Sequence, residues 1–402
     1  MFFCAKTSRK RPAPGLIENV NVLQFRPVNR RSFFYLAASS SLLAAAAEEP
    51  VPTYRIHSRF PRPPHPGMPG PYKGQTVRVH SEKSIDSSSA RVDRAVVKQM
   101  LSAGMRSLTG RNRDEDCWAQ FFSSQDTVGV KVNCSGAPHI MSSPEIVAGI
   151  VENLTAIGVS AKNIWIYERF GGQLESAGYQ KYLPADIHVW AAEAQWTPRG
   201  SLVGYDPNTY VEVDFFGEED TRSFMVRPAA DTFTKIINLP KMKEHQAAGV
   251  TGCLKNIAYG NFSNVDRSHR FTKTNTYSYI GTLASVEPLP SKVVLNIMDA
   301  LSSVWHGGPF SQFPQFRFYP KQILFGTDPV AMDHVAIDII EAKRKAEGAP
   351  SLFDRTPSHL SKDNSNPNFN HFIREPGHVE YASHLGLGIY DSKQIHIKAI
   401  EL

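Results

Sequence analysis

The stretch Thr127-Val-Gly-Val-Lys-Val-Asn133 decides the fold class, because it alternates like a buried strand and ends in polar side chains. Ser143-Pro144-Glu145 then predicts the start of a helix, with a cap, a first-turn proline and an early acid. Residues 146–154 supply its apolar face, and Gly158 ends it. Ile164–Tyr167 is the next predicted strand. This order favours a parallel strand pair, so we expect an α/β fold with mostly parallel sheets and flanking helices.

The rest of the chain continues the α/β pattern. A second helix is predicted from Pro329, with Asp328 as its cap, and a third over 378–385. Further strands are predicted at Tyr210–Phe216, Lys235–Leu239, Val293–Met298, Gln322–Phe325 and 394–400. We therefore expect two α/β lobes, about residues 76–205 and 206–402, with a cleft between them.

The N-terminal segment is typical of an export signal. Arg30-Arg31 precede a short apolar stretch and the alanines 44–47, and paired arginines in this position are typical of the twin-arginine route. We predict a signal over residues 1–47, a proline-rich linker over 48–75, and a periplasmic or other extracytoplasmic location. The apolar stretch is too short to span a membrane, so no stable span is expected after signal removal.

The charge of the chain resides in the predicted signal. Residues 1–47 hold seven Lys or Arg and one acid, so their removal leaves 37 basic and 37 acidic residues. This balance argues against nucleic acid as a partner. Three cysteines remain, Cys117, Cys134 and Cys253, without any C-x-x-C spacing. We therefore expect no iron–sulfur cluster, and either one disulfide or three buried thiols.

A glycine-rich run carries the candidate site. It reads His245-Gln-Ala-Ala-Gly-Val-Thr-Gly-Cys-Leu-Lys-Asn256 and follows the predicted strand that ends near Leu239. A strand end of an open α/β sheet is where ligands bind, and glycines let the backbone approach them closely. His245 and Lys243 are therefore candidate catalytic residues, with the imidazole as acid or base. The alternative is a basic surface loop with a glycine hairpin.

The same reasoning gives the binding residues. The candidates for holding a ligand or cofactor are Lys255, Asn256, Thr251, Gly249, Gly252, Lys131 and Asn133. Lys131 in an apolar strand requires a partner, for which Glu168 and Asp299 are candidates. Asp333 is a candidate to be buried against His269 or Arg270. A small anionic molecule is the expected partner of the lysines.

Several of these motifs occur in an order that resembles a known family. They are Val130-Lys131-Val132-Asn133, Leu239-Pro240-Lys241-x-Lys243-x-His245, Gly249-Val-Thr251-Gly252-x-x-Lys255-Asn256, Met298-Asp299-Ala300, Gly308-Pro309, Thr327-Asp328-Pro329-Val330-Ala331-x-Asp333 and Ala382-x-x-Leu385-Gly386-Leu387-Gly388. Together they resemble the domain-of-unknown-function family number 362 over roughly residues 125–390. The resemblance implies the α/β fold rather than an activity.

A more distant resemblance is to the lactate racemases, the nickel-pincer nucleotide enzymes. His245-x-x-x-Gly249-Val-Thr251-Gly252-x-x-Lys255 is similar to their H-x-x-x-G-[FV]-[ST]-G-x-x-K stretch. The resemblance implies Lys255 as the cofactor anchor, His245 as the base and His269 as a metal ligand. Asp299 is the other candidate ligand of a divalent metal.

Two functions from different classes follow. One is a metal- or cofactor-dependent enzyme, racemase- or epimerase-like, acting on a small anion. The other is an extracytoplasmic protein that binds an anion or a metal without turnover. A base that faces the lysines favours the enzyme, whereas a histidine turned into the core favours the binding protein.

Overall fold

The structure, a computed structural model, describes residues 50–194, 201–269 and 273–402. The predicted export signal lies outside the described residues. From residue 50 onward the described chain belongs to one compact unit, built on a sheet of eight strands. In spatial order they are β17 (His396–Glu401), β2 (Gln75–His80), β14 (Gln322–Gly326), β11 (Val293–Ala300), β8 (Lys235–Asn238), β3 (Val128–Lys131), β4 (Ile164–Phe170) and β5 (His188–Glu193).

Seven strands of this sheet run in one direction. β14 alone runs against them, because it pairs antiparallel with both β11 and β2. The pairs β17–β2, β11–β8, β8–β3, β3–β4 and β4–β5 are parallel. The expected α/β fold with a mostly parallel sheet and flanking helices is therefore confirmed. The β-α-β unit read from the sequence is β3, the helix α3 (Pro144–Ala156) and β4.

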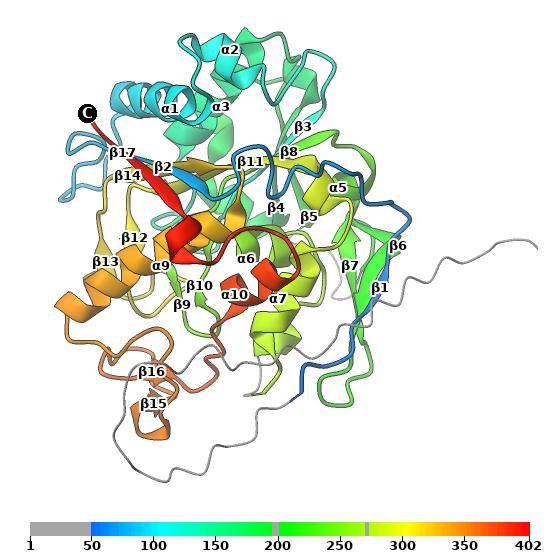
Figure 1. Ribbon diagram of the computed structural model, residues 1–402, viewed down its shortest axis with the longest axis vertical. Helices are drawn as coiled ribbons and strands as arrows, with labels where there is room; N and C mark the ends of the chain where they lie inside the picture. Colours follow the sequence, from blue (N-terminus) through cyan, green and yellow to red (C-terminus); the bar gives the residue numbers. More distant parts are fainter. Residues whose placement is uncertain (1–49, 195–200, 270–272) are drawn as a thin grey trace, which may run out of the picture. The chain divides into compact units, whose positions relative to one another are not determined.

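Helices cover both faces of the sheet (Figure 1). Helices α1 (Arg94–Thr109), α2 (Asp114–Trp118) and α3 bury apolar residues against one face. Helices α6 (Gly252–Tyr259), α7 (Thr276–Ala284), α9 (Pro329–Ala346) and α10 (His378–His384) do so on the other face. The shorter helices are α4 (Gly171–Ala177), α5 (Arg227–Asp231) and α8 (Leu289–Lys292). Parallel strands buried on both faces require the near-continuous apolar runs that the sequence has.

Small sheets complete the described chain. One contains β1 (Arg55–His57), β6 (Tyr205–Glu212) and β7 (Arg222–Val226). The pairs are β9 (Glu244–His245) with β10 (Gly249–Val250), β12 (Ser303–Val304) with β13 (Arg317–Phe318), and β15 (Leu360–Ser361) with β16 (Asn370–His371). No described helix has the length and apolar character needed to cross a membrane.

Two predicted boundaries, that of the linker at residue 75 and that between the lobes at residue 205, can be compared with the packing of the chain. β1 lies within the predicted linker, where it pairs with β6, and Met68 in the same segment is fully buried. The eight-stranded sheet takes strands from both sides of residue 205, and the division into two lobes stays a prediction. Locally, β6 begins at Tyr205 rather than at the predicted Tyr210.

Candidate functional site

The candidate site lies where parallel strands end. The ends of β3 and β8 are level, because Lys131 pairs with Asn238. Asn238 in turn is level with Asn296 of β11. Polar residues placed at these strand ends therefore share one edge of the sheet, which is the usual ligand edge of an α/β fold.

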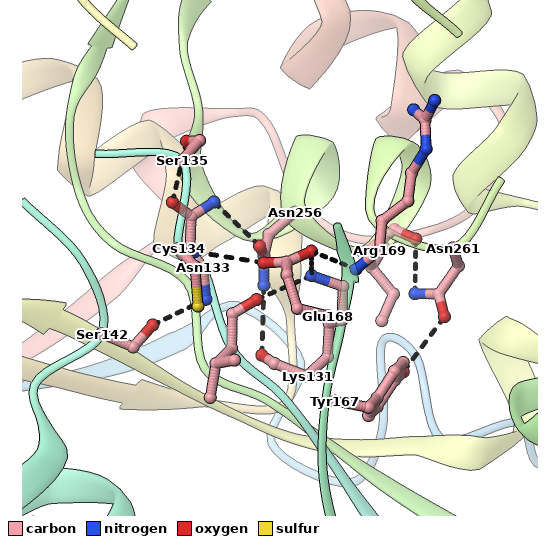
Figure 2. A network of polar contacts seen from close by, with 12 residues as sticks. Lys131, Asn133, Cys134, Ser135, Ser142, Tyr167, Glu168, Arg169, Asn256 and Asn261 are labelled. Carbon is pink, nitrogen blue, oxygen red and sulfur yellow. Dashed lines mark hydrogen bonds and ion pairs between the residues drawn. The ribbon is translucent and has the colours of Figure 1, made fainter. Parts of the chain in front are cut away.

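Lys131 is held by a buried ion pair (Figure 2). Its Nζ donates to Glu168 Oε1 at 2.7 Å and to the Val132 carbonyl at 2.6 Å. Glu168 also accepts backbone N–H groups, from Cys134 at 3.1 Å and from Arg169 at 2.7 Å. Both side chains are nearly inaccessible, so the predicted partner of Lys131 is confirmed, and the pair joins β3 to β4.

Asp299 is also engaged in a buried ion pair. Its Oδ1 accepts from Lys241 Nζ at 2.8 Å and from the Leu301 backbone N–H at 3.0 Å. Its Oδ2 accepts from the backbone N–H and the hydroxyl of Ser143 at 2.7 and 2.6 Å. Asp299 therefore ties the start of α3 to the end of β11. Both oxygens have protein partners without any metal.

Four buried asparagines form a chain of amide hydrogen bonds across this edge. Asn133 Nδ2 donates to Asn256 Oδ1 at 3.0 Å, and Asn256 Nδ2 donates to Asn238 Oδ1 at 2.8 Å. Asn238 Nδ2 then donates to Asn296 Oδ1 at 2.9 Å. The chain links α6 to three strands. Asn133 and Asn256, predicted as binding residues, thus meet each other and fix the position of Lys255, the residue before Asn256.

Lys243 is buried without a carboxylate of its own. Its Nζ donates to Ser135 Oγ at 2.6 Å, and that hydroxyl donates to Asn133 Oδ1 at 3.3 Å. Among nearby acids, Glu168 has the largest electrostatic effect on Lys243, but that carboxylate is paired with Lys131. Burial lowers the pKa of Lys243 to about 7. Near neutral pH this amine therefore exchanges readily between its charged and neutral forms.

Lys255 is buried in a second cationic position. Its Nζ lies 4.4 Å from the ring centroid of Tyr259, one turn further along α6. Across the described ranges it has no ion pair with a carboxylate. Burial, with Lys243, Arg169 and Lys131 adding to it, lowers the pKa of Lys255 to about 7. A buried ammonium without a counterion is costly, so this side chain is suited to receive an anion.

The hairpin of β9 and β10 brings these groups together. His245 pairs with Gly249, and the Thr251 N–H donates to the Lys243 carbonyl at 2.9 Å. Lys243 therefore lies beside the start of α6, which carries Lys255. The Thr251 hydroxyl is buried without a hydrogen-bond partner in the described structure.

The hairpin also fixes the tautomer of His245. Its Nδ1 accepts the backbone N–H groups of Ala247 and Ala248 at 3.1 and 3.3 Å. A ring that accepts at Nδ1 carries its proton on Nε2, so His245 is a donor at Nε2. Burial and the neighbouring Lys255 lower its pKa well below the usual value and keep the ring neutral. The predicted acid/base residue thus presents an N–H rather than a lone pair.

His269 lies against His245. The two rings stack with centroids 5.0 Å apart, and Tyr259 lies 5.1 Å from His269. His269 Nε2 is buried without a partner among the described residues. The structure therefore joins His245, His269 and Lys255 around Tyr259, and it places Asp299 in a separate set of contacts with Lys241 and Ser143.

The backbone angles and close contacts at two positions of the hairpin and α6 require glycine. Gly249 and Gly252 have φ angles of +82° and +56°. A Cβ on Gly252 would lie 2.3 Å from Asp333 Oδ1. Asp333 accepts the N–H groups of Cys253 and Leu254, so it caps α6. Arg270, one of its two predicted neighbours, lies outside the described residues. The nearby carboxylate and the positive φ require a glycine at 252, while its role in ligand binding stays a prediction.

Two buried residues were missed by sequence reasoning. Arg374 donates through Nη2 to Glu244 and contributes to the lowered pKa of His245, yet its Nε and Nη1 have no described partner. His378 at the start of α10 is buried, and burial lowers its pKa to about 3, with Lys255 adding to the shift. Arg374 lies near the end of the long polar segment 350–376 and His378 just after it, and nothing local in the sequence indicates that they lie near the hairpin.

The described donors do not make up a metal site by themselves. Within residues 50–194, 201–269 and 273–402, no three His, Cys, Asp or Glu side chains gather to hold a metal ion. The metal role of His269 and Asp299 stays a prediction, and no step below depends on it. Cys117, Cys134 and Cys253 are free buried thiols, which decides between the two alternatives for the cysteines.

Comparison with protein families assigns most of the central part of the chain to a family. The family described as Domain of unknown function (DUF362) matches residues 128–338, which include the hairpin, α6 and most of the central strands. No curated protein matches the chain.

Proposed function

The chain belongs to the DUF362 family, and we propose that it is an enzyme that binds a small anion between Lys243, Lys255 and His245. The observation that carries this proposal is a pair of buried lysines beside a neutral imidazole, neither of which is ion-paired with any carboxylate that the structure describes. Such groups in a buried site are typical of catalytic positions rather than of structural ion pairs.

Each group has a distinct chemical role in the proposal. Lys255, in its charged form, holds the anion. Lys243, whose pKa is about 7, accepts a proton from the substrate in its neutral form and returns it. His245 donates its Nε2–H to a substrate oxygen, where negative charge develops when the proton leaves. Proton removal and return at a carbon beside a carboxylate is the reaction class that racemases and epimerases share.

A second candidate is an anion-binding protein without turnover. The tautomer of His245 favours it, because Nδ1 is occupied by two backbone N–H groups and the ring cannot accept a proton there. In this case the lysines and the Nε2–H only bind the anion. The two candidates differ in whether Lys243 accepts a proton from the ligand.

The test uses small carboxylates, including 2-hydroxy acids, with the full exported protein. Thermal unfolding measures binding, and NMR in D2O measures exchange of the hydrogen beside the carboxylate. We expect stabilisation and exchange, with Lys243→Met abolishing exchange and Lys255→Met weakening binding. Lys292→Met is the matched control, since Lys292 is also partly buried but donates to the Ala229 and Ala230 carbonyls instead. Binding without exchange supports the second candidate, and no binding removes both.

Export and cofactor attachment belong to the same proposal. The paired arginines support translocation of an already folded protein, and a protein that acquires a cofactor before export would need this route. Lys255 has no ion pair with a described carboxylate, which is compatible with its predicted role as a cofactor anchor.

A further inference from the structure

We infer that the ligand of this site carries two negative charges, as a dicarboxylate or a phosphoryl or sulfuryl group does. This inference rests on the proposed function, because it concerns the anion bound between Lys243, Lys255 and His245. It goes further by inferring the charge of the ligand from the ion pairs of the buried cations that act on the two lysines.

Among the described residues, the other buried cations around the site each form an ion pair with a carboxylate, whereas the two lysines do not. Lys131 is paired with Glu168 at 2.7 Å, and Arg169 Nε donates to Glu193 at 3.0 Å. The remaining buried pairs of this region are Lys241 with Asp299 and Arg374 with Glu244. In the parts of the chain that the structure describes, Lys243 and Lys255 therefore have no carboxylate left to pair with.

The two lysines come from different elements but share one environment. Lys243 lies just before β9, and Lys255 lies on α6. The charge of Lys243 lowers the pKa of Lys255, and the charges of both lysines lower the pKa of His245. Two such cations in a low-dielectric region repel each other unless anionic charge lies between them. One singly charged ligand would leave one ammonium uncompensated.

Buried polar groups that lack a hydrogen-bond partner add to this requirement. The Thr251 hydroxyl, His269 Nε2, and Nε and Nη1 of Arg374 are buried without partners among the described residues. The Nε2 of His245 carries a proton because Nδ1 accepts from the backbone. Buried donors are normally satisfied. A dianion offers several acceptor oxygens, and so it matches these donors better than a single carboxylate does.

The inference predicts that binding takes up protons. The titratable and charged groups that act on the two lysines are Glu168, Cys134, Lys241, Lys131 and Arg169, with His245, His269 and His378 as neutral neighbours. In the free protein both lysines are partly neutral near pH 7. A dianion favours the charged forms, so affinity rises as pH falls from about 9 to about 6 and then levels off. Exchange of the substrate hydrogen needs the neutral form of Lys243, so it should slow as pH falls over the same range.

Sulfate and malonate are suitable probes, with acetate and formate as singly charged controls at constant ionic strength. We expect the dianions to bind at least about tenfold more tightly than the monoanions. Calorimetry in buffers of different ionisation enthalpy at pH 8 should show uptake of about one to two protons per sulfate.

Single variants assign the effect to the lysines. Lys243→Met and Lys255→Met should each weaken sulfate binding roughly tenfold and each lower the proton uptake, whereas Lys292→Met should change neither. Methionine replaces a buried uncompensated charge by an apolar chain of similar length, so both variants should fold.

The outcomes separate the two proposals. If acetate and sulfate bind equally tightly, or sulfate binds without proton uptake, the two-charge inference is wrong while anion binding stands. If none of the four anions binds, the proposed function itself fails.

Discussion

At the scale of single residues, the role of each buried lysine depends on whether it is paired with a carboxylate. Lys131 and Lys241 each have a carboxylate within 2.8 Å, and Lys243 and Lys255 have none of their own. The sequence marks all four as lysines near strand ends. Only their contacts separate the structural pairs from the groups that are free to bind.

Removing one member of a structural pair should destabilise the fold. Lys131→Met leaves Glu168 buried without its cation, so the free energy of unfolding should fall by about 3–5 kcal/mol. Urea unfolding measures the change. The exposed pair Lys343–Glu347 is the control, since Lys343→Met should change stability by only about 0.5 kcal/mol or less. A Lys131→Met variant as stable as the parent would show that the pair does not stabilise the fold. In the double variant Lys131→Met with Glu168→Gln, part of the lost unfolding free energy should be restored.

At the scale of elements, α6 depends on a carboxylate from another helix. Asp333 of α9 accepts N–H groups at the start of α6, and burial raises the pKa of this carboxyl to about 7. The contact fixes α6 against α9. The asparagine chain fixes the same helix against β3, β8 and β11, so the position of Lys255 is determined from two sides.

This arrangement predicts an intolerance at one glycine. In Gly252→Ala the new Cβ would lie 2.3 Å from Asp333 Oδ1 at a φ of +56°. We expect a loss of about 1–3 kcal/mol in unfolding free energy and weaker anion binding, measured by chemical unfolding and calorimetry.

Gly172→Ala in α4 is the matched control. No atom lies within 4 Å of the Cβ that it would add, so the variant should be neutral or slightly stabilising. Equal effects of the two substitutions would refute the explanation for Gly252.

At the scale of the whole molecule, we predict that the N-terminal signal directs the protein out of the cytoplasm. Because Arg30-Arg31 precede a short apolar stretch, the exported protein should begin near Glu48. N-terminal sequencing of extracytoplasmic material tests the cleavage site, and Arg30→Lys with Arg31→Lys should block export. A mature chain that retains residues 20–45 would contradict the prediction.

The same purified material tests cofactor attachment. Intact mass and metal analysis should reveal added mass on Lys255 together with nickel if the resemblance to lactate racemases extends to the cofactor. An unmodified mass without nickel would contradict the cofactor prediction, and the proposal of an anion-binding site would still stand.

The sequence by itself determined the β-α-β order, most strand positions and the helix starts at Pro144 and Pro329. These depend on local patterns of apolar residues, caps and prolines, which act within a few residues. It also indicated that Lys131 requires a partner, since a lysine in a buried strand is costly unless paired.

Only the tertiary structure decided what the site residues do. Three contacts show this. Lys241 and Asp299 are separated by 58 positions in the chain, Cys253 and its capping residue Asp333 by 80, and Glu244 and Arg374 by 130. The tautomer of His245 depends on two backbone N–H groups of a hairpin whose geometry the sequence does not state. Charge and hydrogen-bond pairing are properties of packed neighbours, and these neighbours are distant in the chain.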